Sequence, residues 1–233
     1  SKALGLMSGG LDSTLAAMTL MRQGVEVTGI SFVTPFFGAG KAIQAAELIG
    51  FPLMVKEISD IHLQMVKNPK YGYGRNMNPC IDCHAMMFRL AGEIMEREGF
   101  DFLFSGEVLG QRPMSQNANA LRSVANYSDF NDKVLSPLSA KLLPITPMEE
   151  AGLVDREQLL DIQGRSRKPQ QALAVKWGYN DYPSSRGGCL LTEVGFSDRL
   201  RDLFQHNPEA NATDAELLKV GRQFRLSDSC KFV

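Results

Sequence analysis

The stretch Leu4-Gly5-Leu6-Met7-Ser8-Gly9-Gly10-Leu11-Asp12-Ser13-Thr14-Leu15-Ala16 decides how the chain folds. It reads as a short buried strand, then a loop with two adjacent glycines, then the start of a helix. Glycines accept positive φ and let backbone N–H groups converge, while the hydroxyls of Ser8, Ser13 and Thr14 add donors at the positive end of a helix dipole. The stretch therefore predicts a phosphate-binding loop.

Two other phosphate-binding motifs do not fit this loop. A Walker A loop needs a Lys followed by Ser or Thr after a longer glycine loop, and the dinucleotide fingerprint needs three spaced glycines. An ordinary strand-to-helix turn is the remaining alternative, because adjacent glycines are common in such turns. The agreement of strand, glycines, hydroxyls and helix start favours phosphate binding.

Strands and helices alternate after this loop. Strands are predicted over residues 25–33, 52–58 and 100–104, and helices over 15–23, 41–49 and 85–98. This alternation predicts an α/β fold with a parallel sheet flanked by helices, in which ligands bind beyond the carboxyl ends of the strands.

The second half is predicted to be smaller and mostly helical. Helices are expected over 156–162, 196–203 and 214–224, the last capped by Thr213, and the start of a hairpin after 221. The sequence-based division is an α/β domain with the phosphate-binding loop over 1–150, a helical extension that carries the third cysteine loop over 151–220 and the beginning of a further element over 221–233.

The bulk composition is that of a globular protein. The 233 residues are 44% hydrophobic and 22% charged, with a formal net charge of -1, so nucleic-acid binding would need a local patch or a domain outside this chain. No apolar run approaches the ~20 residues of a membrane span, and no secretory signal opens the chain. We therefore expect a cytoplasmic protein, in which four cysteines serve catalysis or metal binding more often than disulfides.

Three of the cysteines lie in two informative segments. Cys80-Ile81-Asp82-Cys83-His84 leads into a helix, and Cys189 follows a Gly-Gly pair. The first segment also matches the attachment site of c-type haem and a thioredoxin-like redox pair, which the missing export signal and the surrounding pattern disfavour. A helix start is expected to lower the pKa values of Cys80 and Cys83, which suits metal ligation or sulfur chemistry. Cys230, near the end, is left out of the site.

Polar residues also follow the buried strand that ends at Phe104. Ser105-Gly106-Glu107 places a carboxylate at the carboxyl edge of the sheet, on the same side as the opening loop. A basic cluster, Gly164-Arg165-Ser166-Arg167-Lys168, is either a solvated surface turn or a site for phosphates.

The opening loop, Ser8-Gly9-Gly10-Leu11-Asp12-Ser13, resembles the PP-loop of the ATP pyrophosphatase superfamily. The segment Ser105-Gly106-Glu107-Val108-Leu109-Gly110-Gln111, followed by Ser115-Gln116, looks like the second motif of the tRNA 4-thiouridine synthetases, and tRNA 2-thiouridylases share the first motif. The resemblance implies an adenine nucleotide alpha hydrolase-like fold over about residues 3 to 150, in which 137–146 resembles the last strand region of these enzymes. It also implies an enzyme that uses ATP and Mg²⁺ to transfer AMP to a substrate oxygen.

The resemblance assigns site residues. ATP is expected to contact Met7, Ser8, Gly9, Gly10, Leu11, Asp12, Ser13, Phe32, Ser105, Gly106 and Gln111. Asp12 would assist through Mg²⁺, and Glu107 would complete the adenylating site. The substrate is assigned to Arg165, Arg167, Lys168 and Arg186.

The resemblance further implies an ATP-dependent sulfurtransferase that adenylates a uridine oxygen in tRNA and replaces it with sulfur from a donor protein or sulfide. In one route Cys80 or Cys189 carries a persulfide and the other cysteine resolves it. In the other, Cys80, Cys83 and Cys189 ligate a 4Fe-4S cluster with one open iron. Three cysteines favour the cluster over the persulfide pair, and both over zinc with His84 as a fourth ligand.

Two alternatives stay open. A PP-loop enzyme could adenylate a small molecule for thiolation or amidation, which the near-neutral charge favours and the second motif opposes. A non-catalytic nucleotide- or metal-binding module is the other.

Overall fold

The structure is a computed structural model that describes residues 1–111, 116, 128–183 and 188–233. The chain divides into two compact units. Unit 1 contains residues 1–32, 39–56 and 84–185, and unit 2 contains residues 33–38, 57–83 and 186–233. The units interleave along the chain, so their limits differ from the sequence-based division at residues 150 and 220.

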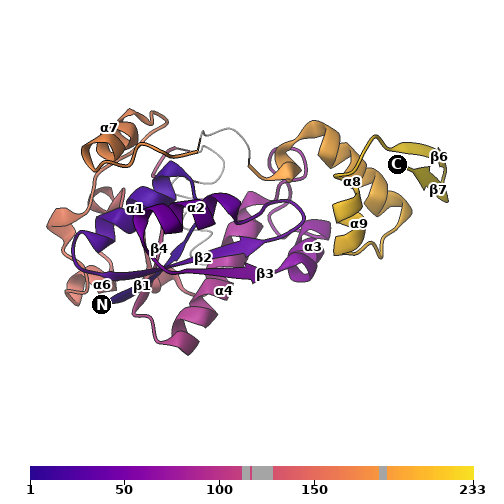
Figure 1. The fold of residues 1–233 in the computed structure, drawn as a ribbon. Coiled ribbons are helices and arrows are strands. Elements are labelled where there is room, and N and C mark those ends of the chain that lie inside the picture. The colour runs from indigo at the N-terminus through magenta and orange to yellow at the C-terminus, as the bar shows by residue number, and fades with distance from the viewer. Residues whose placement is uncertain (112–115, 117–127, 184–187) are drawn as a thin grey trace. The chain divides into compact units, whose positions relative to one another are not determined.

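Unit 1 is built on a five-stranded sheet in the order β3-β2-β1-β4-β5 (Figure 1). The strands are β1 (Lys2–Leu6), β2 (Glu26–Val33), β3 (Leu53–Glu57), β4 (Phe102–Ser105) and β5 (Val134–Leu135). β1 pairs in parallel with β2 and β4, and β4 with β5. The N–H of Gly29 donates to the Pro52 carbonyl and that of Ile58 to the Val33 carbonyl, so β3 also runs parallel to β2. The predicted parallel α/β sheet is confirmed.

The strand order places a crevice between β1 and β4. From β1 the chain moves through β2 to β3 at one edge, then returns to β4 on the other side of β1. The carboxyl ends of two such strands open a crevice where ligands bind in α/β proteins. Leu6 pairs in register with Ser105, so the opening loop and the segment after β4 begin side by side.

Helices cover both faces of this sheet. α1 (Leu11–Met21) and α2 (Gly40–Ile49) lie on one face, and α4 (Cys80–Glu98) lies on the other, as right-handed crossovers in opposite directions require (Figure 1). α7 (Lys168–Lys176) packs against α1, and the short α6 (Pro147–Glu150) is capped by Thr146. Buried side chains of the strands and α1 form the core, among them Ala3, Leu11, Leu15, Phe102 and Phe104.

Two predictions for the second half of unit 1 are wrong. The segment 137–146 contains a 3-10 turn, Ala140–Leu142, and the last strand is the short β5 before it. Pro137 and Pro144 lack the N–H groups that a strand ladder needs. The helix expected over 156–162 is only the 3-10 turn Arg156–Gln158, because the N–H groups of Leu160 and Ile162 donate to the carbonyls of residues 137 and 138 instead.

Unit 2 is a helical unit with a C-terminal hairpin. It contains α3 (Ser59–Lys67), α8 (Val194–His206), α9 (Ala212–Leu217) and the hairpin of β6 (Phe224–Ser227) and β7 (Cys230–Phe232). Its core includes Phe36, Leu63, Val66, Phe196 and Leu200. None of the helices described here or in unit 1 is long and apolar enough to cross a membrane.

The last helix is shorter than predicted. α9 begins at Ala212 and ends at Leu217, and its cap is Asn211 rather than Thr213. The Asn211 side chain accepts from the N–H of Asp214, whose carboxylate accepts from the N–H of Asn211. This reciprocal capping box fixes the helix start. The predicted hairpin after residue 221 is confirmed.

Candidate functional site

The opening loop of unit 1 has the geometry of an anion cradle. Gly9 has a φ of 71°, and a Cβ there would lie 2.1 Å from the carbonyl carbon of Lys41, so only glycine fits. The Ser8 Oγ accepts from the N–H of Gly10 at 3.3 Å and lies 3.2 Å from the Ser13 Oγ. α1 starts at Leu11, so its first N–H groups precede any helical acceptor. Donors therefore converge between the loop and the helix start.

The segment after β4 lies against the start of α1. A Cβ on Gly106 would lie 2.4 Å from the backbone nitrogen of Ser13. Glycine at this position therefore allows the two strand ends to approach closely.

Asp12 is the centre of a polar network in unit 1. Its Oδ2 accepts from Gln111 Nε2 at 2.7 Å and lies 3.4 Å from Arg167 Nη2. The Oε1 of Gln111 in turn accepts from Gln170 Nε2 at 2.7 Å. Asp12 Oδ1 and Arg167 Nε are both buried, and neither has a partner in the part of the chain that the structure describes. A buried carboxylate oxygen and a buried guanidinium N–H without partners are the atoms expected around a cation and an anion that bind together.

Glu107 faces a histidine rather than the Asp12 network. Its Oε1 lies 2.8 Å from the Nδ1 of His84, and the backbone N–H of Glu107 donates to the Ser105 Oγ. Both side chains of this pair are mostly buried. The carboxylate therefore fixes the orientation of the imidazole ring.

The three candidate cysteines all belong to unit 2. Cys80 and Cys83 lie one turn apart at the start of α4, and Cys189 precedes the 3-10 turn Leu190–Thr192. That turn is held in unit 2 because the N–H of Leu190 donates to Phe36 and the carbonyl of Leu191 accepts from Met77. Segments more than a hundred residues apart thus carry cysteines into one unit.

Burial governs the chemistry of these thiols. Burial raises the pKa of Cys83 well above its ordinary value, and nearby Cys189, Cys80 and Asp82 raise it further. Burial also raises the pKa of Cys189 to about 12, against the lowering effect of the Leu191 N–H. The expectation of a lowered pKa is therefore wrong for Cys83, because desolvation outweighs the helix start.

Cys83 has a histidine partner that its sequence spacing did not reveal. The Nε2 of His62 in α3 lies 3.2 Å from the Cys83 Sγ. Burial lowers the pKa of His62 to about 4, so its ring is neutral at physiological pH. No sequence signal marks His62, because it sits within an ordinary amphipathic helix.

The described cysteines do not form a metal site as they stand. Among the residues that the structure describes, no three His, Cys, Asp or Glu side chains are placed to hold a metal ion. The three thiols have suitable donor chemistry for an iron–sulfur cluster, and their ligation of one stays a prediction.

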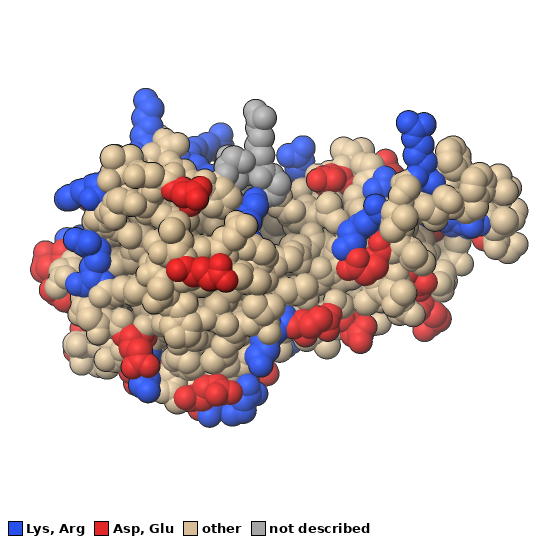
Figure 2. Space-filling model, in the orientation of Figure 1, with Lys and Arg blue, Asp and Glu red and all other residues tan. Residues whose placement is uncertain are grey.

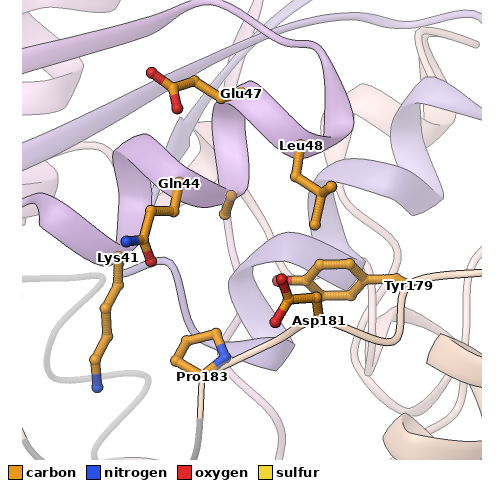
Figure 3. Close-up of a pocket in the computed structure, with 8 residues that line it drawn as sticks. Lys41, Gln44, Glu47, Leu48, Tyr179, Asp181 and Pro183 are labelled. Atoms are coloured by element: carbon orange, nitrogen blue, oxygen red, sulfur yellow. The ribbon is translucent and has the colours of Figure 1, made fainter.

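A separate cavity of about 520 Å³ lies beside α2 in unit 1 (Figure 3). Lys41, Gln44 and Leu48 project from α2 toward it, and Tyr179 and Asp181 line the facing segment. None of the predicted site residues that the structure describes lines this cavity.

A protein-family model matches the part of the chain that contains the opening loop. Residues 1–141, more than half of the chain, match the family described as thiamine biosynthesis protein (ThiI). The chain belongs to the ThiI family. The resemblance of the opening loop to the PP-loop enzymes is thereby confirmed.

Named relatives of this ThiI-family chain fall into two groups. A tRNA-specific 2-thiouridylase MnmA from Acidothermus cellulolyticus is 27% identical over 221 residues, covering 86% of this chain and 58% of the relative. A probable tRNA sulfurtransferase from Thermoanaerobacter pseudethanolicus is 25% identical over 181 residues, covering 73% of this chain and 43% of the relative. The chain thus spans about half the length of these relatives.

One solved structure has the same fold. The crystal structure of a 4-thiouridine synthetase–RNA complex with bound ATP superposes with a TM-score of 0.52 at 20% identity, and covers 94% of this chain and 52% of that one. The predicted adenine nucleotide alpha hydrolase-like fold is therefore confirmed.

The predicted site residues of this ThiI-family chain differ in their position and burial. It brings together the loop, Asp12, Gln111 and Arg167. Met7, Leu11 and Phe32 are buried apolar side chains, so only their backbone is available to a nucleotide. Arg165 and Lys168 are exposed, and Arg186 lies outside the described residues.

Proposed function

We propose that this chain is the ATP-dependent part of a tRNA sulfurtransferase. It would adenylate a uridine oxygen and replace that oxygen with sulfur. The observation that carries the proposal is the pairing of an anion cradle with the buried Asp12 Oδ1, which has no partner among the described residues, beside the carboxyl ends of β1 and β4. The names of the relatives in both groups support the tRNA substrate, and a cytoplasmic location is part of the same proposal.

Each part of the loop has a role in holding ATP. The hydroxyls of Ser8 and Ser13 and the first N–H groups of α1 donate to phosphate oxygens, and the helix dipole favours their charge. Asp12 Oδ1 would ligate Mg²⁺, which neutralises the charge that develops on the leaving pyrophosphate. Gln111 holds the other oxygen of this carboxylate and so fixes its direction. Ser105 and Gly106 form the opposite wall of the site.

Glu107 and His84 form the adjoining polar pair. The 2.8 Å contact holds the ring nitrogen Nδ1 toward the carboxylate, so Nε2 on the opposite side of the ring is the atom that would meet a substrate group. We assign Glu107 to orienting His84 rather than to binding the phosphates directly.

The cysteines of unit 2 supply the sulfur step. Cys80 and Cys189 are half-buried, whereas Cys83 is buried against His62, so the first two are the accessible pair. A persulfide on one of them attacks the activated carbon through its terminal sulfur, and AMP leaves with the electron pair of the C–O bond. The thiolate of the other cysteine then attacks the inner sulfur, which forms a Cys80–Cys189 disulfide and leaves the second sulfur on the base. A thiol reductant restores both cysteines.

An iron–sulfur cluster on Cys80, Cys83 and Cys189 is the competing route, and we derive no step through it. Anaerobic reconstitution with iron and sulfide distinguishes the two, read by absorption and electron paramagnetic resonance of the wild type and Cys83→Ser. We expect neither protein to form a cluster. The loss of free thiols when the Cys80–Cys189 disulfide forms should be the same in Cys83→Ser as in the wild type. A cluster in the wild type that Cys83→Ser loses would overturn the persulfide route.

A small-molecule substrate is the competing function, because the chain has no basic field. The net charge is -1, and basic and acidic side chains are interspersed on the face drawn in Figure 2. Mass spectrometry of nucleosides from bulk tRNA of cells lacking the gene tests the substrate. We expect one thiouridine to disappear and to return with the wild-type gene. An unaltered thiouridine profile would count against tRNA and favour the small molecule.

A further inference from the structure

Arg167 differs from its basic neighbours in the segment before α7. The side chains of Arg165 and Lys168 are exposed, as expected of a solvated turn. The side chain of Arg167 is only 28% exposed, and its Nη2 lies 3.4 Å from Asp12 Oδ2. Its Nε is buried without a partner among the described residues. One member of the basic segment therefore points into the unit 1 site and keeps a donor unused there.

The position of Arg167 is fixed by the segment that leads to it. The N–H of Gly164 donates to the carbonyl of Leu109 at 2.8 Å, which ties this segment to the one that follows β4. Ser139 Oγ donates to the carbonyl of Ile162 and accepts from the N–H of Leu109, so it clamps both segments. The guanidinium is therefore delivered to Asp12 by a hydrogen-bonded framework rather than by an isolated surface turn.

Gln170 secures the same arrangement from inside α7. It is fully buried, and its Nε2 donates to Gln111 Oε1, whose own amide donates to Asp12. Burying the Gln170 amide costs free energy, which its hydrogen bond to Gln111 offsets. We assign Gln170 as a positioning residue that acts through Gln111.

We propose that Arg167 is a catalytic residue that binds the β- and γ-phosphates of ATP and stabilises the pyrophosphate leaving group; this deepens the proposed function and rests on it. Without nucleotide the guanidinium pairs with Asp12. With Mg·ATP bound, Asp12 Oδ1 would hold the metal, and the fork of Arg167, including the Nε that has no partner among the described residues, would donate to phosphate oxygens.

The step it assists is balanced within the proposed reaction. A substrate oxygen forms a bond to the α-phosphorus, and the bond from that phosphorus to the bridging oxygen breaks. The electron pair stays on pyrophosphate, where Arg167 stabilises it, and the proton of the activated base goes to solvent. Negative charge grows on the leaving group in this step, so a guanidinium there contributes more in the transition state than in the ground state.

The test compares the binding of Mg·ATP and AMP by calorimetry in the wild type, Arg167→Ala, Arg167→Lys and Lys176→Ala. Lys176→Ala is the matched control, because it removes a positive charge from an exposed position on α7, the helix that Arg167 precedes. We expect Arg167→Ala to weaken ATP binding about ten- to a hundredfold, the range for a charged hydrogen bond. AMP binding should stay within about twofold, because AMP lacks the phosphates that Arg167 contacts. Arg167→Lys should fall between, since an ammonium keeps the charge but not the fork.

The outcomes separate this inference from the proposed function. If the wild type binds no ATP, the proposed function fails before Arg167 is tested. If the wild type binds ATP and Arg167→Ala binds it equally well, the inference is overturned and the proposed function stands. If both Arg167 variants lose ATP binding and AMP binding equally, Arg167 only supports the loop, and this result also overturns the inference.

Discussion

At the scale of single residues, the two loop glycines have different requirements although they are adjacent. Gly9 has positive φ and no space for a Cβ against α2, whereas Gly10 has a φ of -77° and its nearest neighbour is the Ser8 Oγ at 3.4 Å. We expect Gly9→Ala to lower the free energy of unfolding by more than the ~1–2 kcal/mol of a left-handed alanine, because the clash adds to it. Gly10→Ala should be nearly neutral for stability. Thermal unfolding of both variants checks this, and equal melting temperatures would contradict it.

The cysteines make a second residue-scale prediction. Cys83 and Cys189 have raised pKa values, the latter about 12, so their reactive thiolates are rare at neutral pH. Below its pKa a thiol gains about tenfold in thiolate for each pH unit. We therefore expect alkylation of both to accelerate about tenfold per unit between pH 7 and 9, well behind the exposed Cys230. Peptide mass spectrometry after timed iodoacetamide labelling measures the order; labelling of Cys83 as fast as Cys230 at pH 7 would refute it.

At the scale of elements, the Asp202 carboxylate of α8 holds the C-terminal hairpin through two basic side chains, and His206 of α8 also lies 3.6 Å from Asp228 in the hairpin turn. Asp202 accepts hydrogen bonds from Arg225 and Lys231, which hold its pKa well below the ordinary value. A lowered folded-state pKa adds stability above the unfolded-state pKa, and this stability is lost as pH falls through the folded-state pKa. We expect protection of the β6 and β7 amides from hydrogen exchange to fall in acid, after correction for intrinsic rates.

Two variants on α8 test that prediction. Asp202→Asn should lower hairpin protection at neutral pH and remove its acid dependence. Asp198→Asn, which removes an exposed ion pair with Arg201 on the same helix, should leave the hairpin unchanged. A hairpin equally protected in all three proteins would show that Asp202 does not hold it.

The elements also show what the sequence can and cannot predict. β1, the loop, α1, β2, α2 and β3 follow from local signals, because β-branched runs, helical spacing and terminal glycines such as Gly50 at φ 87° agree with the global fold. The predictions for residues 137–146 and 156–162 are wrong, because these two segments hydrogen-bond to each other through their backbones instead of forming the predicted strand and helix.

The candidate site divides in the same way. The loop and its neighbour after β4 were predictable, because parallel strands end at one edge. The contact of Arg167 with Asp12 and that of His62 with Cys83 were not, because they join residues 155 and 21 positions apart in the chain. Local charge and helix periodicity do not predict these contacts.

At the scale of the whole molecule, the nucleotide residues and the cysteines belong to different compact units. A ligand stabilises what it binds, by about 2.7 kcal/mol at a hundred times its Kd. Hydrogen exchange with and without Mg·ATP should therefore show new protection in residues 8–14, 105–111 and 164–170, all in unit 1. The core of unit 2 around Phe196 and Leu200, away from any assigned nucleotide contact, should change least. Protection confined to unit 2 would contradict the assignment of the nucleotide to the opening loop. If Arg167→Ala abolishes the protection of that loop by ATP but not by AMP, the loop is connected to the segment that leads into α7.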